Sequence, residues 1–246
     1  MKYILILLIT VGFGACTKEQ DASAVTGSVT FSFNANYGIE AFQPVKAYTY
    51  GSKQTIKFSK LDFYITGIEL LNNTGSTSSD VAALIDLTSS NPSGSTITIP
   101  SIKAGSYSGL RFMLGVKSDL NKKLPKDFPS TSALANTSHY WEAWNSFIFS
   151  KIEGVIDVEN NGNFDLGFAI HTGTDDCLQK IEISKSFEVT ENGNIPFLFD
   201  MDVQKIFFDG TSMFDLVSSP LNHNPVNLEV LKSFSARMAQ SIQLKN

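Results

Sequence analysis

The chain of 246 residues is poor in the residue types that build redox, metal and catalytic sites. It contains two cysteines, Cys16 and Cys177, together with three histidines and two tryptophans. If Cys16 is consumed by lipidation, as argued below, Cys177 is the one thiol that remains. An intrachain disulfide and a cysteine-rich zinc site are then both excluded. A single thiol of this kind is most often a buried, small apolar residue.

Charge is also modest. The chain has 19 Lys and Arg against 24 Asp and Glu, a net charge of −5, and no basic run. This argues against binding to nucleic acid and against electrostatic binding to membranes. Glycine-rich phosphate loops and the Gly-x-Ser-x-Gly motif of serine hydrolases are missing as well. His171 lies near Asp175 and Asp176, but no nucleophile motif accompanies them, so we predict no catalytic residues and no enzyme.

The first residues are typical of an export signal. Met1-Lys2 precedes an apolar run from Tyr3 to Phe13, which is too short to cross a bilayer. Phe13-Gly-Ala-Cys16 resembles a bacterial lipobox, although Phe13 is bulkier than the usual Leu. We predict a lipoprotein signal peptide over 1–15, lipidation of Cys16 and a flexible tether over 16–26. The protein would then be anchored to a membrane of the bacterial cell envelope, on the periplasmic or surface side. The alternative is a plain signal peptide cleaved nearby.

Residues 27–246 are predicted to form a single all-β domain, an antiparallel β-sandwich or barrel-like fold with a C-terminal α-helix. Alternation of apolar and polar residues predicts strands at 27–33, 55–58, 61–70, 82–87, 96–99, 107–114, 147–158, 163–171, 178–189 and 195–201. Asn-Gly turns at 160–163 and 191–194 predict two hairpins. Gly67 is predicted to mark a bulge, because the apolar residues change parity there. Residues 34–51 and 117–138 are predicted to be loops.

The end of the chain has a different periodicity. Apolar residues recur every three or four positions over 227–244, which is typical of one face of an amphipathic helix. No internal repeat and no low-complexity block divides the chain, which is why one domain is predicted.

The scarce residues gather in the stretch 138–154, which contains His139, Trp141 and Trp144. His171 follows in the next predicted strand, and His223 lies near the start of the predicted helix. Copper prefers imidazole and soft sulfur ligands, and two or three ligands suffice for Cu(I). His171, His139 and His223 are therefore candidate metal ligands. In the alternative interpretation His171 bonds to backbone at a strand end and His139 is exposed.

The tryptophan pair has three interpretations. Trp141 and Trp144 could pack on a helical turn, one of them could be a site of oxidation, or both could form a platform for a sugar. We predict packing for one of the two indoles and a functional role for the other.

The hairpin at 157–165 contains oxygen ligands at alternate positions around a central glycine, as calcium loops do. The candidate ligands are Asp157, Glu159, Asn161 and Asp165. Position twelve is Phe168, where a calcium loop requires an acid, and an Asn-Gly hairpin explains the same residues. Calcium is the weaker interpretation.

Five segments in order resemble the MbnP-like proteins, which are copper-binding envelope proteins. The segments are Phe58 to Leu70, Ala104 to Val116 with Leu120-Asn121, Tyr140 to Trp144 with Phe149, Lys151 and Glu153-Gly154, Phe168 to Gly173 with Cys177, and Phe199 to Phe207. The similarity covers about residues 27–210. It implies a β-sandwich that binds copper. In studied relatives the site uses histidines and a tryptophan oxidised to kynurenine by a di-haem peroxidase-like partner.

Residue by residue, His171 matches a family histidine, and Trp141 and Trp144 match the tryptophan pair. The stretch 33–38 lacks the histidine that many members carry there, and the tryptophans are three residues apart instead of two. His139 stands where an apolar residue is common. The predicted function is copper storage, uptake or delivery. The alternatives are a member that has lost its metal, and a glycan- or protein-binding module whose tryptophans are exposed and far from His171.

Overall fold

The computed structural model describes residues 25–90, 95–223 and 225–245. The predicted signal peptide, the lipidation site Cys16 and most of the predicted tether lie outside these residues. Within them, no helix combines the length and the apolar character needed to span a membrane.

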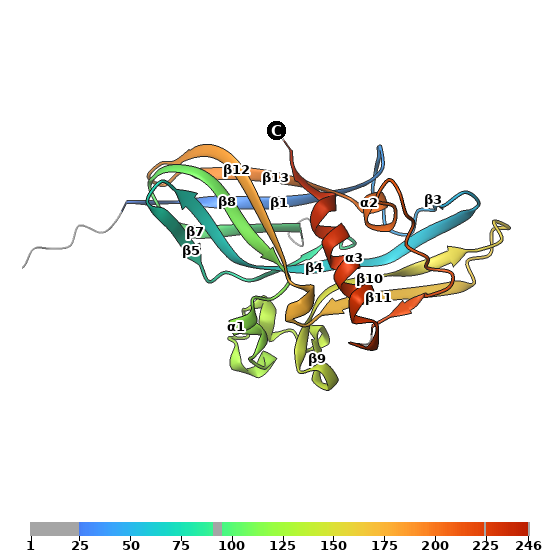
Figure 1. Ribbon diagram of the computed structural model, residues 1–246. Coiled ribbons are helices and arrows are strands. Elements are labelled where there is room, and N and C mark those ends of the chain that lie inside the picture. The colour runs from blue at the N-terminus through green and yellow to red at the C-terminus, as the bar shows by residue number, and fades with distance from the viewer. Residues whose placement is uncertain (1–24, 91–94, 224, 246) are drawn as a thin grey trace, which may run out of the picture.

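The molecule is a β-sandwich of two sheets with a helix near its C-terminus, as predicted (Figure 1). The strands are β1 (Thr26–Tyr37), β2 (Glu40–Ala41), β3 (Tyr48–Tyr50), β4 (Gln54–Asn72), β5 (Gly75–Ser79), β6 (Ala83–Asp86), β7 (Thr96–Lys103), β8 (Gly105–Leu114), β9 (Tyr140–Trp141), β10 (Ser146–Asp157), β11 (Leu166–Gly173), β12 (Gln179–Val189), β13 (Asn194–Asp202), β14 (Leu221–Asn222) and β15 (Ile242–Leu244). The helices are α1 (Ser118–Asn121), α2 (Val203–Phe207) and α3 (Leu228–Ser241). Short 3₁₀ turns are η2 (Pro125–Asp127), η3 (Ala133–Ala135), η4 (Thr137–His139), η5 (Glu142–Trp144), η6 (Asp175–Cys177) and η7 (Pro225–Asn227).

The smaller sheet has the order β15-β13-β1-β2, with β7 also paired to β1. The larger sheet has the order β12-β8-β4-β10-β11-β14; β3, β5 and β6 pair with β4, and β9 pairs with β10. Most pairs are antiparallel, but β1 pairs parallel with β13 and β11 pairs parallel with β14.

Aromatic side chains fill the space between the sheets. Phe33 and Phe199 stack at 4.9 Å between ring centres, and Phe31, on the same face of β1, meets Phe112 of the larger sheet at 5.8 Å. All four side chains are fully buried. The alternation seen in the sequence thus directs every second residue of β1 into the core.

Strand β4 replaces the two predicted strands 55–58 and 61–70. Its pairing with β8 shifts register between Thr66 and Glu69, and Gly67 has φ +57°. The bulge predicted at Gly67 is confirmed, because a left-handed backbone conformation is one that glycine adopts without steric cost. The predicted loop 34–51 is partly wrong, since β1 continues to Tyr37 and the short strands β2 and β3 follow.

The hairpin predicted for 178–201 is also wrong. β12 pairs with β8 in the larger sheet, whereas β13 pairs with β1 in the smaller one. The turn between them carries the chain across the sandwich, so Phe187 and Phe197 meet edge to face in the core at 5.0 Å. The alternation of apolar residues fits either arrangement, because both strands have one buried face.

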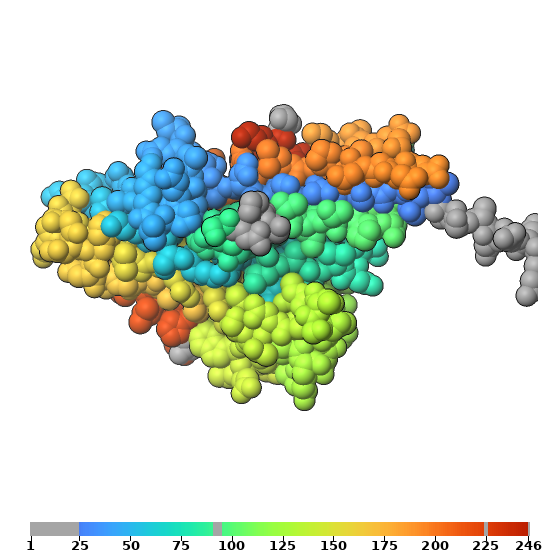
Figure 2. All heavy atoms as spheres, turned by 180° about the vertical axis from the view of Figure 1, so that it is seen from behind, coloured from blue at the N-terminus to red at the C-terminus, as the bar shows by residue number. Residues whose placement is uncertain are grey.

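The predicted C-terminal helix exists but is shorter than expected. α3 ends at Ser241, and residues 242–244 form β15 beside β13. α3 packs on α2 and β11 (Figure 1). The long connection 117–145 carries α1, β9 and 3₁₀ turns, and forms a lobe that projects from the larger sheet (Figures 1 and 2).

Candidate metal centre

Two of the three histidines meet at one edge of the larger sheet. The parallel pairing of β11 with β14 sets Ala169 beside Leu221 and Ile170 beside Asn222. The next step of the same register brings His171 to His223. Their ring centres are 6.0 Å apart, with ring planes inclined by 48°. Residues more than fifty positions apart in sequence therefore share one site.

Trp141 covers this histidine pair. Its ring lies 5.6 Å from that of His223, nearly parallel to it, and 6.4 Å from that of His171, edge to face. The segment 140–141 is held there by antiparallel pairing of β9 with β10. Trp141 thus combines a place beside both imidazoles with partial exposure to solvent.

Trp144 supports Trp141 from the other side. The two indoles stack at 4.4 Å with an interplanar angle of 13°. Trp144 lies against Gly173 so closely that a Cβ atom at this glycine would be 3.2 Å from the indole ring. Trp144 thus packs on Trp141 and Gly173, while Trp141 lies at the candidate site.

Glu153 orients His171. The carboxylate oxygen Oε1 lies 2.7 Å from Nε2 of His171. A carboxylate can only accept, so Nε2 carries the hydrogen and Nδ1 keeps its lone pair in the neutral ring. Burial lowers the pKa of His171 below its ordinary value, although the hydrogen bond to Glu153 acts in the opposite direction. Burial has the larger effect and favours the neutral imidazole, while the hydrogen bond to Glu153 defines Nδ1 as the nitrogen available as a ligand.

His139 lies elsewhere, contrary to the idea that it is exposed. Its side chain is 5% exposed, and Nε2 is 3.0 Å from Oδ2 of Asp62 on β4. Nδ1 faces the side-chain nitrogen of Asn136 at 3.2 Å and the hydroxyl of Ser138 at 3.1 Å. The ring packs edge to face on Tyr64. Both ring nitrogens thus have partners outside the His171–His223 cluster.

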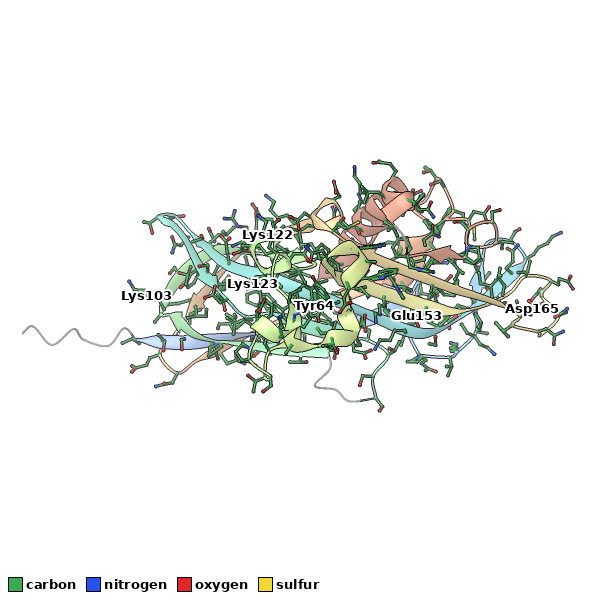
Figure 3. All side chains as sticks on the ribbon, turned by 90° about the horizontal axis from the view of Figure 1, so that it is seen from below. Tyr64, Lys103, Lys122, Lys123, Glu153 and Asp165 are labelled. Atoms are coloured by element: carbon green, nitrogen blue, oxygen red, sulfur yellow. The ribbon has the colours of Figure 1, made fainter. Side chains whose placement is uncertain are left out.

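The acidic hairpin loop uses its oxygens internally. The buried carboxylate of Asp157 accepts backbone N–H groups of Asn161 at 3.1 Å and Gly162 at 2.7 Å, and Glu159 accepts from the Asn161 amide. These bonds close the turn that the Asn-Gly sequence predicts. Figure 3 shows Asp165 at the tip of this hairpin, with Glu153 nearer the lobe.

Cys177 is 1% exposed and is part of the apolar core, and burial raises the pKa of its thiol. A neutral buried thiol is a poor metal ligand, because the thiolate is the ligating form.

The separation of the two histidine rings matches that of two imidazoles on one metal ion. Two imidazoles that share an ion through bonds of about 2.0 Å have ring centres about 6 Å apart, close to the separation of His171 and His223. Over residues 25–90, 95–223 and 225–245, no three His, Cys, Asp or Glu side chains gather as a metal-binding group. A site here would therefore rest on two imidazoles, which is a donor set that suits Cu(I).

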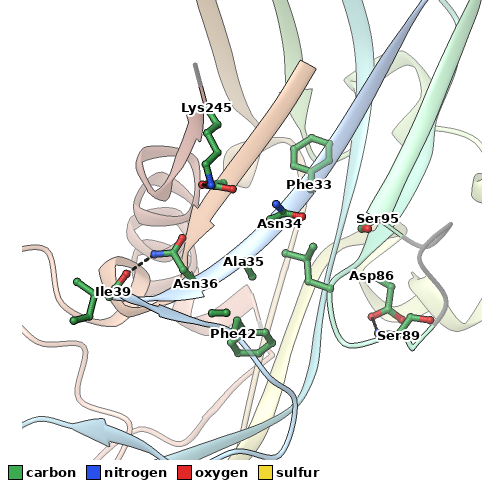
Figure 4. A pocket seen from close by; sticks show the side chains of 14 residues that line it. Phe33, Asn34, Ala35, Asn36, Ile39, Phe42, Asp86, Ser89, Ser95 and Lys245 are labelled. Atoms are coloured by element: carbon green, nitrogen blue, oxygen red, sulfur yellow. Dashed lines mark hydrogen bonds and ion pairs between the residues drawn. The ribbon is translucent and has the colours of Figure 1, made fainter. Parts of the chain in front are cut away.

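A separate groove of about 650 Å³ lies between β1, β2 and the segment after β6 (Figure 4). Its polar lining includes Asn34, Asn36, Asp86, Asp200 and Lys245. It contains none of the histidines or tryptophans, so it is a feature distinct from the cluster around His171.

Three contributing residues were missed at the level of sequence. Glu153 could have been noticed as an acid on the strand before His171, but only the register shows that it reaches Nε2. Gly173 carries no signal apart from being small. Asp62 is one polar residue within a mostly apolar strand, and the sequence alone does not indicate that its carboxylate is buried and bonded.

Comparison with known proteins agrees with this fold. The solved structure of MbnP from Methylosinus trichosporium is similar, with a TM-score of 0.52, 13% identity and 82% of each chain covered. No curated protein matches the chain. The sequence profile of the MbnP family matches residues 26–227, most of the described chain, and the chain therefore belongs to the MbnP family.

Proposed function

We propose that this protein is a lipid-anchored copper-binding protein of the bacterial cell envelope, which stores, takes up or delivers copper and turns over no substrate. The observation that carries the proposal is the meeting of His171 and His223 beside Trp141. Membership in the MbnP family supports copper as the metal, through the resemblance described above. The anchor is proposed from the sequence around Cys16.

In this proposal His171 and His223 hold the ion, and His223 takes the part of the histidine that the stretch 33–38 lacks. Glu153 keeps the His171 ring in one tautomer and one orientation, as outer-sphere carboxylates do for metal-bound histidines. The two neutral imidazoles offer nitrogen ligands that copper prefers over the oxygen ligands used by calcium. Calcium is not part of the proposal.

Trp141 is the indole that we propose for oxidation by a di-haem peroxidase-like partner. Both indoles are partly exposed, but Trp141 is the one that contacts the two histidine rings, whereas Trp144 lies between Trp141 and Gly173. The glycan-binding alternative expects the tryptophans to be far from His171, and the ring distance of 6.4 Å does not agree with that expectation.

The test starts from full-length protein exported by a bacterial host, measured for metal content and by mass spectrometry of the peptide that contains both tryptophans. Copper in the parent, and its loss in His171→Ala and His223→Ala, are expected. Glu188→Ala, on the exposed edge strand β12, is the matched control and should keep its copper. Copper-free parent protein with unmodified tryptophans would overturn the proposal.

The anchor is tested separately. Cys16→Ser should move the protein from the membrane fraction to the soluble fraction after cell breakage, and lipid labelling of the parent should be lost. Unchanged fractionation of the variant would show that Cys16 is not the attachment point.

A further inference from the structure

A network of charged and polar side chains with a buried centre, Asp62 and His139, lies near the candidate copper site. Asp62 is fully buried, and its Oδ2 contacts His139 at 3.0 Å and the Lys60 ammonium at 2.9 Å. Lys60 also reaches Asp86 at 2.8 Å. Within the described residues, Oδ1 of Asp62 has no hydrogen-bond partner. Burying such groups costs free energy that burying an apolar pair would not cost, which favours a specific role for the network.

The position of Asp62 on the sheet indicates what this role is. Asp62 pairs with Lys151 of β10, and Lys151 pairs with His171 of β11. Directly paired residues share a face of the sheet, so these three side chains form one row. With strands about 4.8 Å apart, Asp62 and His171 stand about 10 Å from one another.

The tryptophan segment crosses this row. His139 is fixed above β4 by Asp62, and the carbonyl of Ser138 accepts a hydrogen bond from Nζ of Lys151 at 2.7 Å. Trp141, two residues further, reaches His171. Two extended residues span at most about 7 Å. With His139 above β4, this reach is long enough to place Trp141 over the histidine pair.

Besides the His139–Asp62 contact, the segment is fixed by the short β9–β10 pairing and by the hydrogen bond from Lys151 to Ser138. The regular elements of the connection 117–145 are α1 and four short 3₁₀ turns, and β9 contributes two residues to the sheet. Such short elements supply few backbone hydrogen bonds, and long connections of this kind in compact domains are commonly functional. A directional side-chain bond from a buried carboxylate defines one position, whereas apolar contacts permit sliding.

We propose that His139 and Asp62 form a positioning pair, which holds the segment 138–141 so that Trp141 lies against His171 and His223 and on the ring of Trp144, which is itself held at Gly173. His139 is thereby not a ligand but the residue that places the tryptophan at the site. The role in copper affinity rests on the proposed function; the placement of Trp141 does not, because it exists without metal.

The primary measurement is circular dichroism of the metal-free protein. Indoles stacked as closely as Trp141 and Trp144 give an exciton couplet, which disappears when either ring moves away. His139→Leu should lose at least half of the couplet, because the apolar side chain fills the space without bonding Asp62. His139→Gln, which can still donate to the carboxylate, should recover most of it.

The control separates placement from stability. Ile181→Ala removes a buried side chain from β12 at the opposite edge of the larger sheet, and should lower thermal stability while leaving the couplet unchanged. A couplet of parental size in folded His139→Leu would overturn the proposal. Should His139→Leu not fold, Asp62→Asn decides in the same way, since it retains the shape of the side chain and weakens the bond.

The second measurement is Cu(I) affinity of the same variants. A loss of about 10- to 100-fold in His139→Leu, the range for outer-sphere partners, is expected, with little change in Ile181→Ala. If the parent protein binds no Cu(I), the proposed function fails, while the couplet still decides the role of His139. Parental affinity in His139→Leu with a lost couplet would remove the link between placement and metal binding.

Discussion

Removal of the Glu153 carboxylate tests how the candidate site is tuned. Its oxygen lies 2.7 Å from Nε2 of His171, and the Glu153 side chain is 38% exposed. Outer-sphere partners of metal-bound histidines contribute about 10- to 100-fold in affinity. Because solvent weakens this contact, we expect Glu153→Ala to fall at the lower end, about 10-fold or about 1.4 kcal/mol. Glu153→Gln retains a neutral acceptor and should lose about half of that free energy, since charge-assisted hydrogen bonds are about twice as strong.

The assay is an anaerobic titration in which the protein competes with a chromogenic chelator for Cu(I). Thermal unfolding of the metal-free protein is measured alongside it. Exposed ion pairs contribute at most about 1 kcal/mol to folding. Both variants should therefore unfold at a temperature close to that of the parent protein. Glu188→Ala is the matched control for removal of one negative charge. Parental affinity in Glu153→Ala, or an equal loss in Glu188→Ala, would refute the orienting role of this carboxylate.

Two further predictions concern the scaffold. A Cβ atom at Gly154 would lie 1.9 Å from the carbonyl oxygen of Lys57. Gly154→Ala should therefore lower the free energy of unfolding, measured with urea, by about 3 kcal/mol or more. A loss below about 1 kcal/mol would show that β10 and β4 can separate there. The hydrogen bond from Arg111 holds the pKa of Glu69 below its ordinary value, so the stabilisation from this pair is present above that value of 4.5 and is lost as pH falls through the lower pKa of the folded state. Glu69→Gln should therefore flatten the acid side of the stability profile, and an unchanged profile would contradict this.

Local signals predicted much of the fold. The Asn-Gly turn at 160–163 joins β10 and β11 as expected, because its chemistry acts within a few residues. The similar turn at 191–194 joins strands of different sheets instead. Nothing near that turn distinguishes the two outcomes; they depend on β8 and β1, which compete as partners from far along the chain.

The residues of the candidate site were likewise predictable from the sequence only in part. Trp141, His171 and His223 could be selected because such residues are rare in this chain. The separate place of His139 could not, since it depends on Asp62, a carboxylate within an apolar strand whose burial appears only in three dimensions. Scarcity thus indicates which residues carry chemistry, while the register of the strands decides which of them meet.

The parallel pairing of β1 with β13 has a consequence for how the chain folds. Ser28 bonds Asn194, which is 166 positions later. Contacts of such long sequence separation are slow to form, because the loop must close before they stabilise anything. Until β13 is available, β1 has β7 as its long partner, and its other edge is unpaired. During synthesis the first strand would therefore keep one edge unpaired, open to wrong partners, until most of the chain has been made.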